Sequence, residues 1–208
     1  MHFVLDDADM VGRRAEELVA LTTEQGFAFF LAMGTAYRGW TLAEAGDAEA
    51  GVDLLRRGIE GFQASGAAWT LPFYLAQLAA AEAKAARFET GLGQLSDALA
   101  LTEKLGVRWF EAELHRRRGE LMLAARPGAE AEAETEFRHA IAIARQQEAK
   151  LWELRSAVSL ARLWHGQDKV DEARGLLAPV YGWFNEGFDI RDLKESKALL
   201  EYLGVDSF

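Results

Sequence analysis

The chain has 208 residues, half of them hydrophobic, and its 23 Lys and Arg against 33 Asp and Glu give a formal net charge of −10. The length allows one large domain or an array of small units, and the acidic balance argues against nucleic acid as the main partner because it repels phosphate backbones. The absence of cysteine excludes disulfides and thiolate metal sites and fits a cytoplasmic protein.

No apolar run approaches the roughly 20 residues that a membrane span needs, and no signal peptide opens the chain, so no membrane partner is expected. Ala and Leu dominate the composition, with Glu and Arg between them, and only three prolines occur. Such a composition favours helices with few interruptions. We therefore expect an all-α protein.

The sequence repeats with a period close to 40 residues. Glycines recur at Gly26, Gly66 and Gly106. An aromatic residue stands three positions after each of them and returns in a fourth unit: Phe29, Trp69, Trp109 and Trp152. A small residue early in each second helix recurs at Gly51, Gly91, Ala133 and Ala173. Two markers with one period indicate structural repeats, and we expect Trp69, Trp109 and Trp152 to be buried between neighbouring repeats.

Each repeat is predicted to hold two helices, A and B, joined by a turn. The repeats cover residues 27–66, 67–106, 107–148 and 149–186. The A helices are expected over about 27–45, 72–86, 109–125 and 151–165. The B helices are expected over about 48–65, 89–105, 131–147 and 170–184. Gly66 and Gly106 are predicted to cap B helices, and Pro72 to lie in the first turn of an A helix.

Two further helices flank the repeats. Residues 9–25 align with the B helix of the first repeat and lack an A helix before them, so we expect the second half of a truncated repeat from a longer protein. Residues 188–203 break the pattern and are predicted to form a C-terminal capping helix, which a stacked array needs. The prediction is a single domain over residues 1–208, a right-handed α-solenoid of about four helix pairs.

The alternation of small and large residues resembles that of tetratricopeptide (TPR) repeats. It is carried by Gly39, Gly51, Leu55 and Gly58 in the first repeat, by Gly119, Ala133, Phe137 and Ala140 in the third, and by Ala161, Ala173 and Leu177 in the fourth. The period exceeds the roughly 34 residues usual for these repeats, with the extra length in helices and connections. Small residues allow helices A and B of one pair to cross closely.

Three longer segments, residues 112–124, 149–164 and 177–200, resemble the C-terminal TPR region of bacterial signalling ATPases of the STAND class, many of which carry an adenylate or guanylate cyclase domain. The resemblance implies a scaffold or sensor module in signal transduction. Its partners would be a protein or peptide and the upstream ATPase or cyclase domains. No GxxxxGK[ST] phosphate loop occurs in this chain, so we do not expect it to bind ATP.

No catalytic constellation stands out in the sequence. The histidines, at positions 2, 115, 139 and 165, include no pair four residues apart and no HExxH motif, so neither a metal site nor a cofactor is predicted. The many carboxylates are typical of the helical surface of an acidic protein. We therefore expect a protein that is not an enzyme.

The candidate partner site is a mixed aromatic and charged strip on the groove face of the A helices. Its residues are Tyr37, Trp40, Phe73, Gln77, Glu113, Arg116, Glu120, Arg155 and Arg162. The arginines are suited to clamp a peptide carboxylate while aromatic side chains form apolar pockets. The alternative is a lattice of Arg–Glu pairs between adjacent helices.

Two other possibilities remain open at this point. The domain could bind a small-molecule effector instead of a peptide. The exposed edge at the first helix could also promote self-association of the chain.

Overall fold

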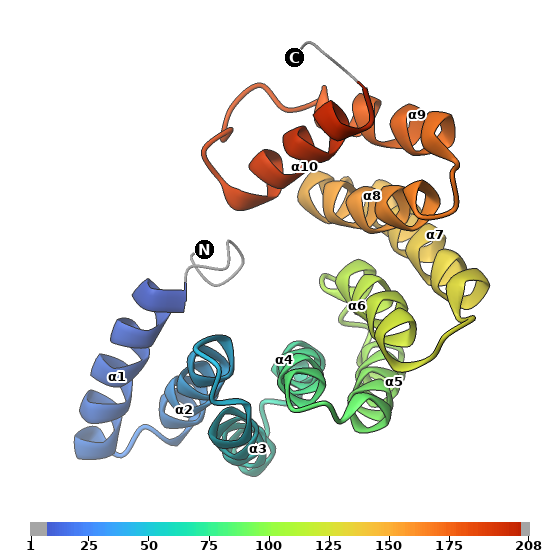
Figure 1. The fold of residues 1–208 in the computed structure, drawn as a ribbon. Helices are drawn as coiled ribbons and strands as arrows, with labels where there is room; N and C mark the ends of the chain where they lie inside the picture. The colour runs from blue at the N-terminus through green and yellow to red at the C-terminus, as the bar shows by residue number, and fades with distance from the viewer. Residues whose placement is uncertain (1–7, 205–208) are drawn as a thin grey trace. The chain divides into compact units, whose positions relative to one another are not determined.

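The computed structural model describes residues 8–204, and this part of the chain is helical without strands (Figure 1). Its elements, in chain order, are α1 (Ala8–Gln25), α2 (Ala28–Glu44), α3 (Ala48–Ser65), the short 3-10 helix η1 (Ala68–Thr70), α4 (Leu71–Lys84), α5 (Phe88–Leu105), α6 (Glu111–Ala125), α7 (Glu130–Gln146), α8 (Lys150–His165), α9 (Val170–Tyr181) and α10 (Arg191–Tyr202). The all-α class predicted from the sequence is confirmed. None of these helices combines the length and the apolar character that crossing a bilayer requires.

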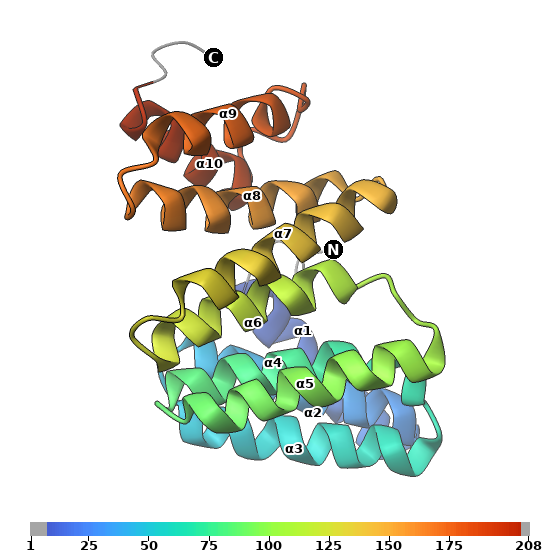
Figure 2. The ribbon, with the colours of Figure 1, turned by 90° about the vertical axis from the view of Figure 1, so that its right-hand side faces the viewer.

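The chain divides into two compact units, Met1–Phe110 and Glu111–Phe208. In the first unit α1 packs on α2, and the pairs α2/α3 and α4/α5 follow. In the second, the pairs are α6/α7 and α8/α9, and α10 packs against α8 and α9. Figure 2 shows the two helices of each pair lying side by side. A single domain over residues 1–208, and the repeat boundaries within it, stay predictions.

Small residues let paired helices touch backbone to backbone. A Cβ added to Gly39 of α2 would lie 2.7 Å from the backbone nitrogen of Leu55 and 2.8 Å from the carbonyl oxygen of Gly51, both in α3. In the pair α6/α7, a Cβ on Gly119 would lie 2.6 Å from the ring of Phe137. These distances are shorter than any ordinary Cβ contact. The TPR-like positions therefore carry small residues because a larger one would push the helices apart.

The capping glycines and the first-turn proline predicted from the sequence are confirmed. Gly66 and Gly106 follow α3 and α5 with φ of +76° and +68°, the left-handed conformation that glycine adopts without strain. Pro72 lies in the first turn of α4, where a missing N–H costs no helical hydrogen bond. At the other end of the chain α9 ends at Tyr181 and α10 begins at Arg191, so both helices are shorter than expected.

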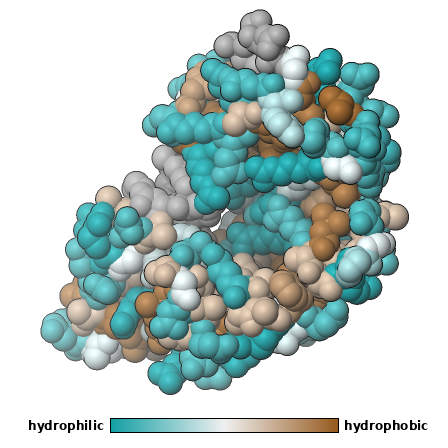
Figure 3. Space-filling model, in the orientation of Figure 1, coloured by the Kyte–Doolittle hydropathy of each residue, from teal (hydrophilic) through white to brown (hydrophobic). Residues whose placement is uncertain are grey.

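Each unit has its own apolar core. In the first unit, the rings of Phe62 and Tyr74 stack with centroids 4.4 Å apart and join α3 to α4. In the second unit, α7, α8, α9 and α10 supply the large buried side chains of the core: Phe137, Leu154, Leu160, Leu177, Leu193 and Leu200. Figure 3 shows both hydrophilic and apolar residues on the visible face of each unit.

The tryptophans expected between repeats are not buried as a set. Trp69 is 57% exposed and Trp109 is 45% exposed, while Trp152 is half-buried. Trp69 belongs to η1 and Trp109 precedes α6, so neither lies on the inward face of an A helix. Phe110 takes the buried place next to Trp109 and contacts Phe73 edge to face, with centroids 5.0 Å apart. The predicted burial is therefore wrong for Trp69 and Trp109.

Candidate functional site

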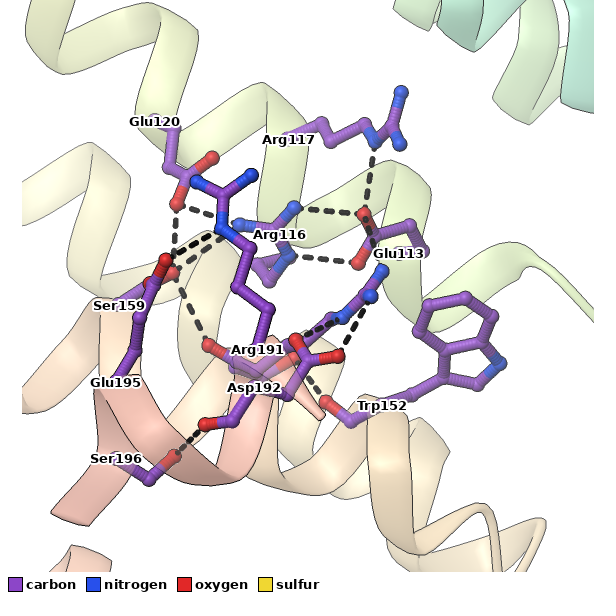
Figure 4. A network of polar contacts seen from close by, with 12 residues as sticks. Glu113, Arg116, Arg117, Glu120, Trp152, Ser159, Arg191, Asp192, Glu195 and Ser196 are labelled. Carbon is purple, nitrogen blue, oxygen red and sulfur yellow. Dashed lines mark hydrogen bonds and ion pairs between the residues drawn. The ribbon is translucent and has the colours of Figure 1, made fainter. Parts of the chain in front are cut away.

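A network of charged side chains lies in the second unit, where α6, α8 and α10 meet (Figure 4). It contains four residues that the sequence placed in the groove: Glu113, Arg116, Glu120 and Arg155. The fifth candidate of this unit, Arg162, lies about two turns after Arg155 in α8 and pairs with Glu195 of α10 at the outer edge of the network.

Glu113 of α6 is the centre of the network. Its side chain is fully buried, and Arg116 binds both of its oxygens, with Nε 2.7 Å from Oε2 and Nη2 2.7 Å from Oε1. Arg117 donates from Nε to Oε1 at 2.8 Å, and Arg155 of α8 approaches the same oxygen at 4.0 Å. A buried carboxylate is tolerated only when it is paired and hydrogen-bonded in this way.

The environment keeps Glu113 ionised. Burial by itself raises the pKa of its carboxyl, but the charges of Arg116, Arg117 and Arg155, together with the hydrogen bonds from Arg116, hold that pKa well below its usual value. The opposite charges therefore outweigh the loss of water. Removing Arg116, which binds both oxygens, would leave this buried carboxylate poorly compensated.

Arg155 connects this centre to α10. Its Nε lies 2.6 Å from Oδ1 of Asp192 and its Nη2 lies 2.8 Å from Oδ2, the parallel geometry that Arg and carboxylate prefer. Its guanidinium also lies 5.1 Å from the ring centroid of Trp152. Arg155 is 9% exposed, so its charge serves mainly to hold α10 against α8.

The network reaches the surface at Glu120 and at α10. Arg116 donates from Nη1 to Oε1 of Glu120 at 2.5 Å, and the hydroxyl of Ser159 donates to the same oxygen at 2.8 Å. On α10, Glu195 accepts from Arg162 at 3.1 Å and from Arg191 at 2.6 Å. In Figure 4, Arg116 lies between Glu113 and Glu120. Arg155 and Arg162 pair with carboxylates of the neighbouring helix α10, as in the lattice between adjacent helices that the sequence left as the alternative. Arg116 instead pairs with Glu113 and Glu120 of its own helix.

The four residues of the first unit that the sequence assigned to the partner site are mostly buried. Trp40, Phe73 and Gln77 are buried, and Tyr37 is half-buried with its ring 6.0 Å from that of Tyr74. The interpretation that Trp40 faces an open groove is corrected. The helix that carries it, α2, packs against α1, α3 and α4, so little of its surface remains open.

Two sets of residues were missed from the sequence. The first is the α10 contribution, Arg191, Asp192 and Glu195, because α10 was interpreted only as a cap. The second is His115 of α6 with Glu136 and His139 of α7, whose potential ligand atoms all lie within 4.8 Å of one another. The Glu-x-x-His spacing at 136 and 139 is the sequence signal for the second set, because it places both side chains on one face of a helix. The fourth histidine, His165, is half-buried against Tyr202, and His2 lies outside the described residues.

No known family model and no curated protein matches this chain. Among solved structures it is similar to a crystal structure of nearly identical TPR-like repeats from a Podosopora anserina protein described as a kinesin light chain. The two share 15% sequence identity with a TM-score of 0.61, over 87% of this chain and 88% of that chain. At this identity the likeness concerns the fold alone. The TPR-like solenoid fold that the sequence predicted is confirmed.

Proposed function

We propose that this chain is a non-catalytic interaction module that binds a protein or peptide partner along its A helices. The observation that carries the proposal is the TPR-like repeat fold itself, because stacked helix pairs expose extended surfaces suited to recognising polypeptides. The chain adds a cluster of arginines and carboxylates on α6, α8 and α10 that offers charged groups to such a partner.

The part of this cluster open to a partner is its exposed edge. Arg162 and Glu195 form a pair at 3.1 Å with side chains 53% and 38% exposed. A pair of this kind contributes at most about 1 kcal/mol, so a partner's carboxylate can replace Glu195 at little cost. The buried pair of Glu113 and Arg116 cannot be displaced so cheaply. In this proposal Arg162 and Glu120 contact the partner, while Glu113, Arg116 and Arg155 hold those contacts in place.

The test is selection from a displayed peptide library, followed by affinity measurements on single variants. We expect enriched peptides to carry a carboxylate whose amidation weakens binding. Arg162→Glu should reduce their affinity at least about tenfold, the loss expected when a charge-assisted contact becomes repulsive. Arg126→Glu is the matched control, since Arg126 is 47% exposed and pairs with Glu132 at the same 3.1 Å. Equal effects of the two substitutions would remove this site from consideration.

The resemblance of residues 112–124, 149–164 and 177–200 to STAND-class proteins supports a narrower version of this function. In that version the chain is the sensor or scaffold part of a cytoplasmic bacterial signalling ATPase or cyclase. Those segments cover α6, most of α8 and the elements from late α9 through α10, which include the charged network. The full reading frame of the gene tests it directly, because the version requires an ATPase or cyclase domain upstream.

A hollow in the first unit supports a second candidate, the binding of a small-molecule effector. It has a volume of about 510 Å³, within the range of ligand pockets, and α3, α4 and α5 line it. Ile59, Leu78 and Leu101 supply apolar walls, and Arg56 and Asp97 supply charge. A metabolite that raises the melting temperature where no peptide does would favour this function over the first.

A further inference from the structure

A group of side chains with metal-ligand chemistry lies apart from the network described above, on the facing sides of α6 and α7. His115 projects from α6, and Glu136 and His139 project from α7. Glu136 and His139 are three residues apart in one helix, so both lie on the same face. Each of the three offers one ligand atom, and all three atoms lie within 4.8 Å of one another.

Two members of the group, His115 and Glu136, are already joined by a hydrogen bond. His115 Nδ1 lies 2.8 Å from Oε2 of Glu136, and both side chains are largely buried. The ring of His139 stands perpendicular to that of His115, with centroids 5.6 Å apart. Two imidazoles and one carboxylate are the donors that Zn²⁺ and related transition metals prefer, and hard cations such as Mg²⁺ do not select them.

The geometry needs only a small adjustment to bind an ion. Ligand atoms around a tetrahedral Zn²⁺ at about 2.1 Å lie about 3.4 Å apart. The shared pair of His115 and Glu136 must therefore open by a fraction of an ångström from 2.8 Å. His139 is exposed, so its side chain can close the remaining distance without disturbing the core.

Glu136 is held in a fixed orientation by a group outside the set. Arg118 donates from Nη2 to Oε1 at 2.5 Å and leaves Oε2 directed to His115. A carboxylate oriented by such an outer partner binds a metal through a single oxygen. The positive charge of Arg118 also repels a metal ion at this site. The affinity should therefore be lower than that of the same three ligands without a neighbouring arginine.

We propose that His115, Glu136 and His139 bind one divalent transition-metal ion of the zinc type, which links α6 to α7. The ion takes the place of the hydrogen bond between His115 and Glu136: the single proton of the neutral imidazole moves from Nδ1 to Nε2, which leaves Nδ1 and Oε2 able to bind the ion. Three protein ligands leave a fourth position for water. Because the two helices meet at this point, the bound ion stabilises their pairing.

The experiment is titration of the untagged chain with Co²⁺ and with Zn²⁺. We expect one equivalent of Co²⁺ to bind with the visible absorption of a four-coordinate ion, Zn²⁺ to displace it, and Zn²⁺ to raise the melting temperature. His139→Gln should lower the affinity at least about tenfold, since even loss of an outer partner costs a metal site that much. His139 is exposed, so this variant keeps the fold, and far-ultraviolet circular dichroism without metal checks that it does.

His165→Gln is the control, because His165 lies outside the group and contacts Tyr202 instead. This variant should bind Co²⁺ as the parent chain does. His115→Gln should weaken binding like His139→Gln. The proposal is overturned if the parent chain takes up no Co²⁺, if the absorption survives in His139→Gln, or if His165→Gln loses the ion to the same extent.

Discussion

Arg155 of α8 and Asp192 of α10 form a bidentate ion pair, with Nε 2.6 Å from Oδ1 and Nη2 2.8 Å from Oδ2. Their side chains are 9% and 14% exposed. Asp192 lies in the first turn of α10, where its charge also suits the helix dipole. The pair therefore fixes the start of α10 on α8, while Leu193 and Leu200 bury the apolar face of α10 in the core.

Asp192→Asn should destabilise the chain markedly, because it removes the carboxylate that binds the buried guanidinium of Arg155 through two oxygens. We expect the free energy of unfolding in urea to fall by about 3 kcal/mol, near the lower limit for breaking a buried pair. Hydrogen exchange should accelerate first in α10. Lys197→Gln, which removes an exposed pair on the same helix at 3.9 Å, should cost less than about 0.5 kcal/mol. Similar losses in both variants would contradict the role given to Asp192.

Glu113→Gln should remove a pH-dependent part of the stability. The folded-state pKa of Glu113 lies below its usual value, so this carboxylate contributes fully above about pH 4.3 and loses its contribution as the pH falls toward the folded pKa. The variant should lose about 3–4 kcal/mol at neutral pH, since three arginines then face a neutral amide. Urea unfolding between neutral and acidic pH should show the two proteins converging below about pH 4.3. A constant difference across that range would exclude this linkage.

Two Gly→Ala substitutions should change the stability of the chain in opposite directions. Gly39→Ala introduces a methyl group 2.7 Å from the backbone of α3 and should cost about 1–3 kcal/mol through overpacking. Gly93→Ala, in the middle of α5 with no atom within 4 Å of the added Cβ, should stabilise by about 0.5–1 kcal/mol through helix propensity. Thermal and urea denaturation measure both. Stabilisation by Gly39→Ala would show that close backbone contact does not explain the small residue there.

Self-association is expected at the edge formed by α1 and the start of α2. Leu21, Phe27 and Phe30 are large apolar side chains exposed in this region. Sedimentation velocity over a wide concentration range should show a reversible dimer that Leu21→Glu weakens because a buried charge opposes association. Tyr202→Glu, at an exposed position on α10, should leave the dimer unchanged. A parent chain that stays monomeric at high concentration would rule out this interface.

The sequence by itself determined the helices, their pairing and the reason for the small residues. Caps at Gly66 and Gly106 and the close crossing at Gly39 depend on a few neighbouring positions, so a pattern of residues reveals them. The repeat period then predicted which helices pair. Helical spacing also placed Glu113 and Arg116 on one face of α6, where the structure pairs them.

Only the tertiary structure decided which face of each helix is covered and which distant side chains meet. Trp40 is buried and Trp69 is exposed, because the neighbours of α2 and the short helix η1 set their surroundings. The pairing of Arg155 with Asp192, and the meeting of His115 with Glu136 and His139, likewise require residues of different helices. Periodicity specifies the direction of a side chain about its own axis, whereas the angle and depth at which helices pack specify what that side chain contacts.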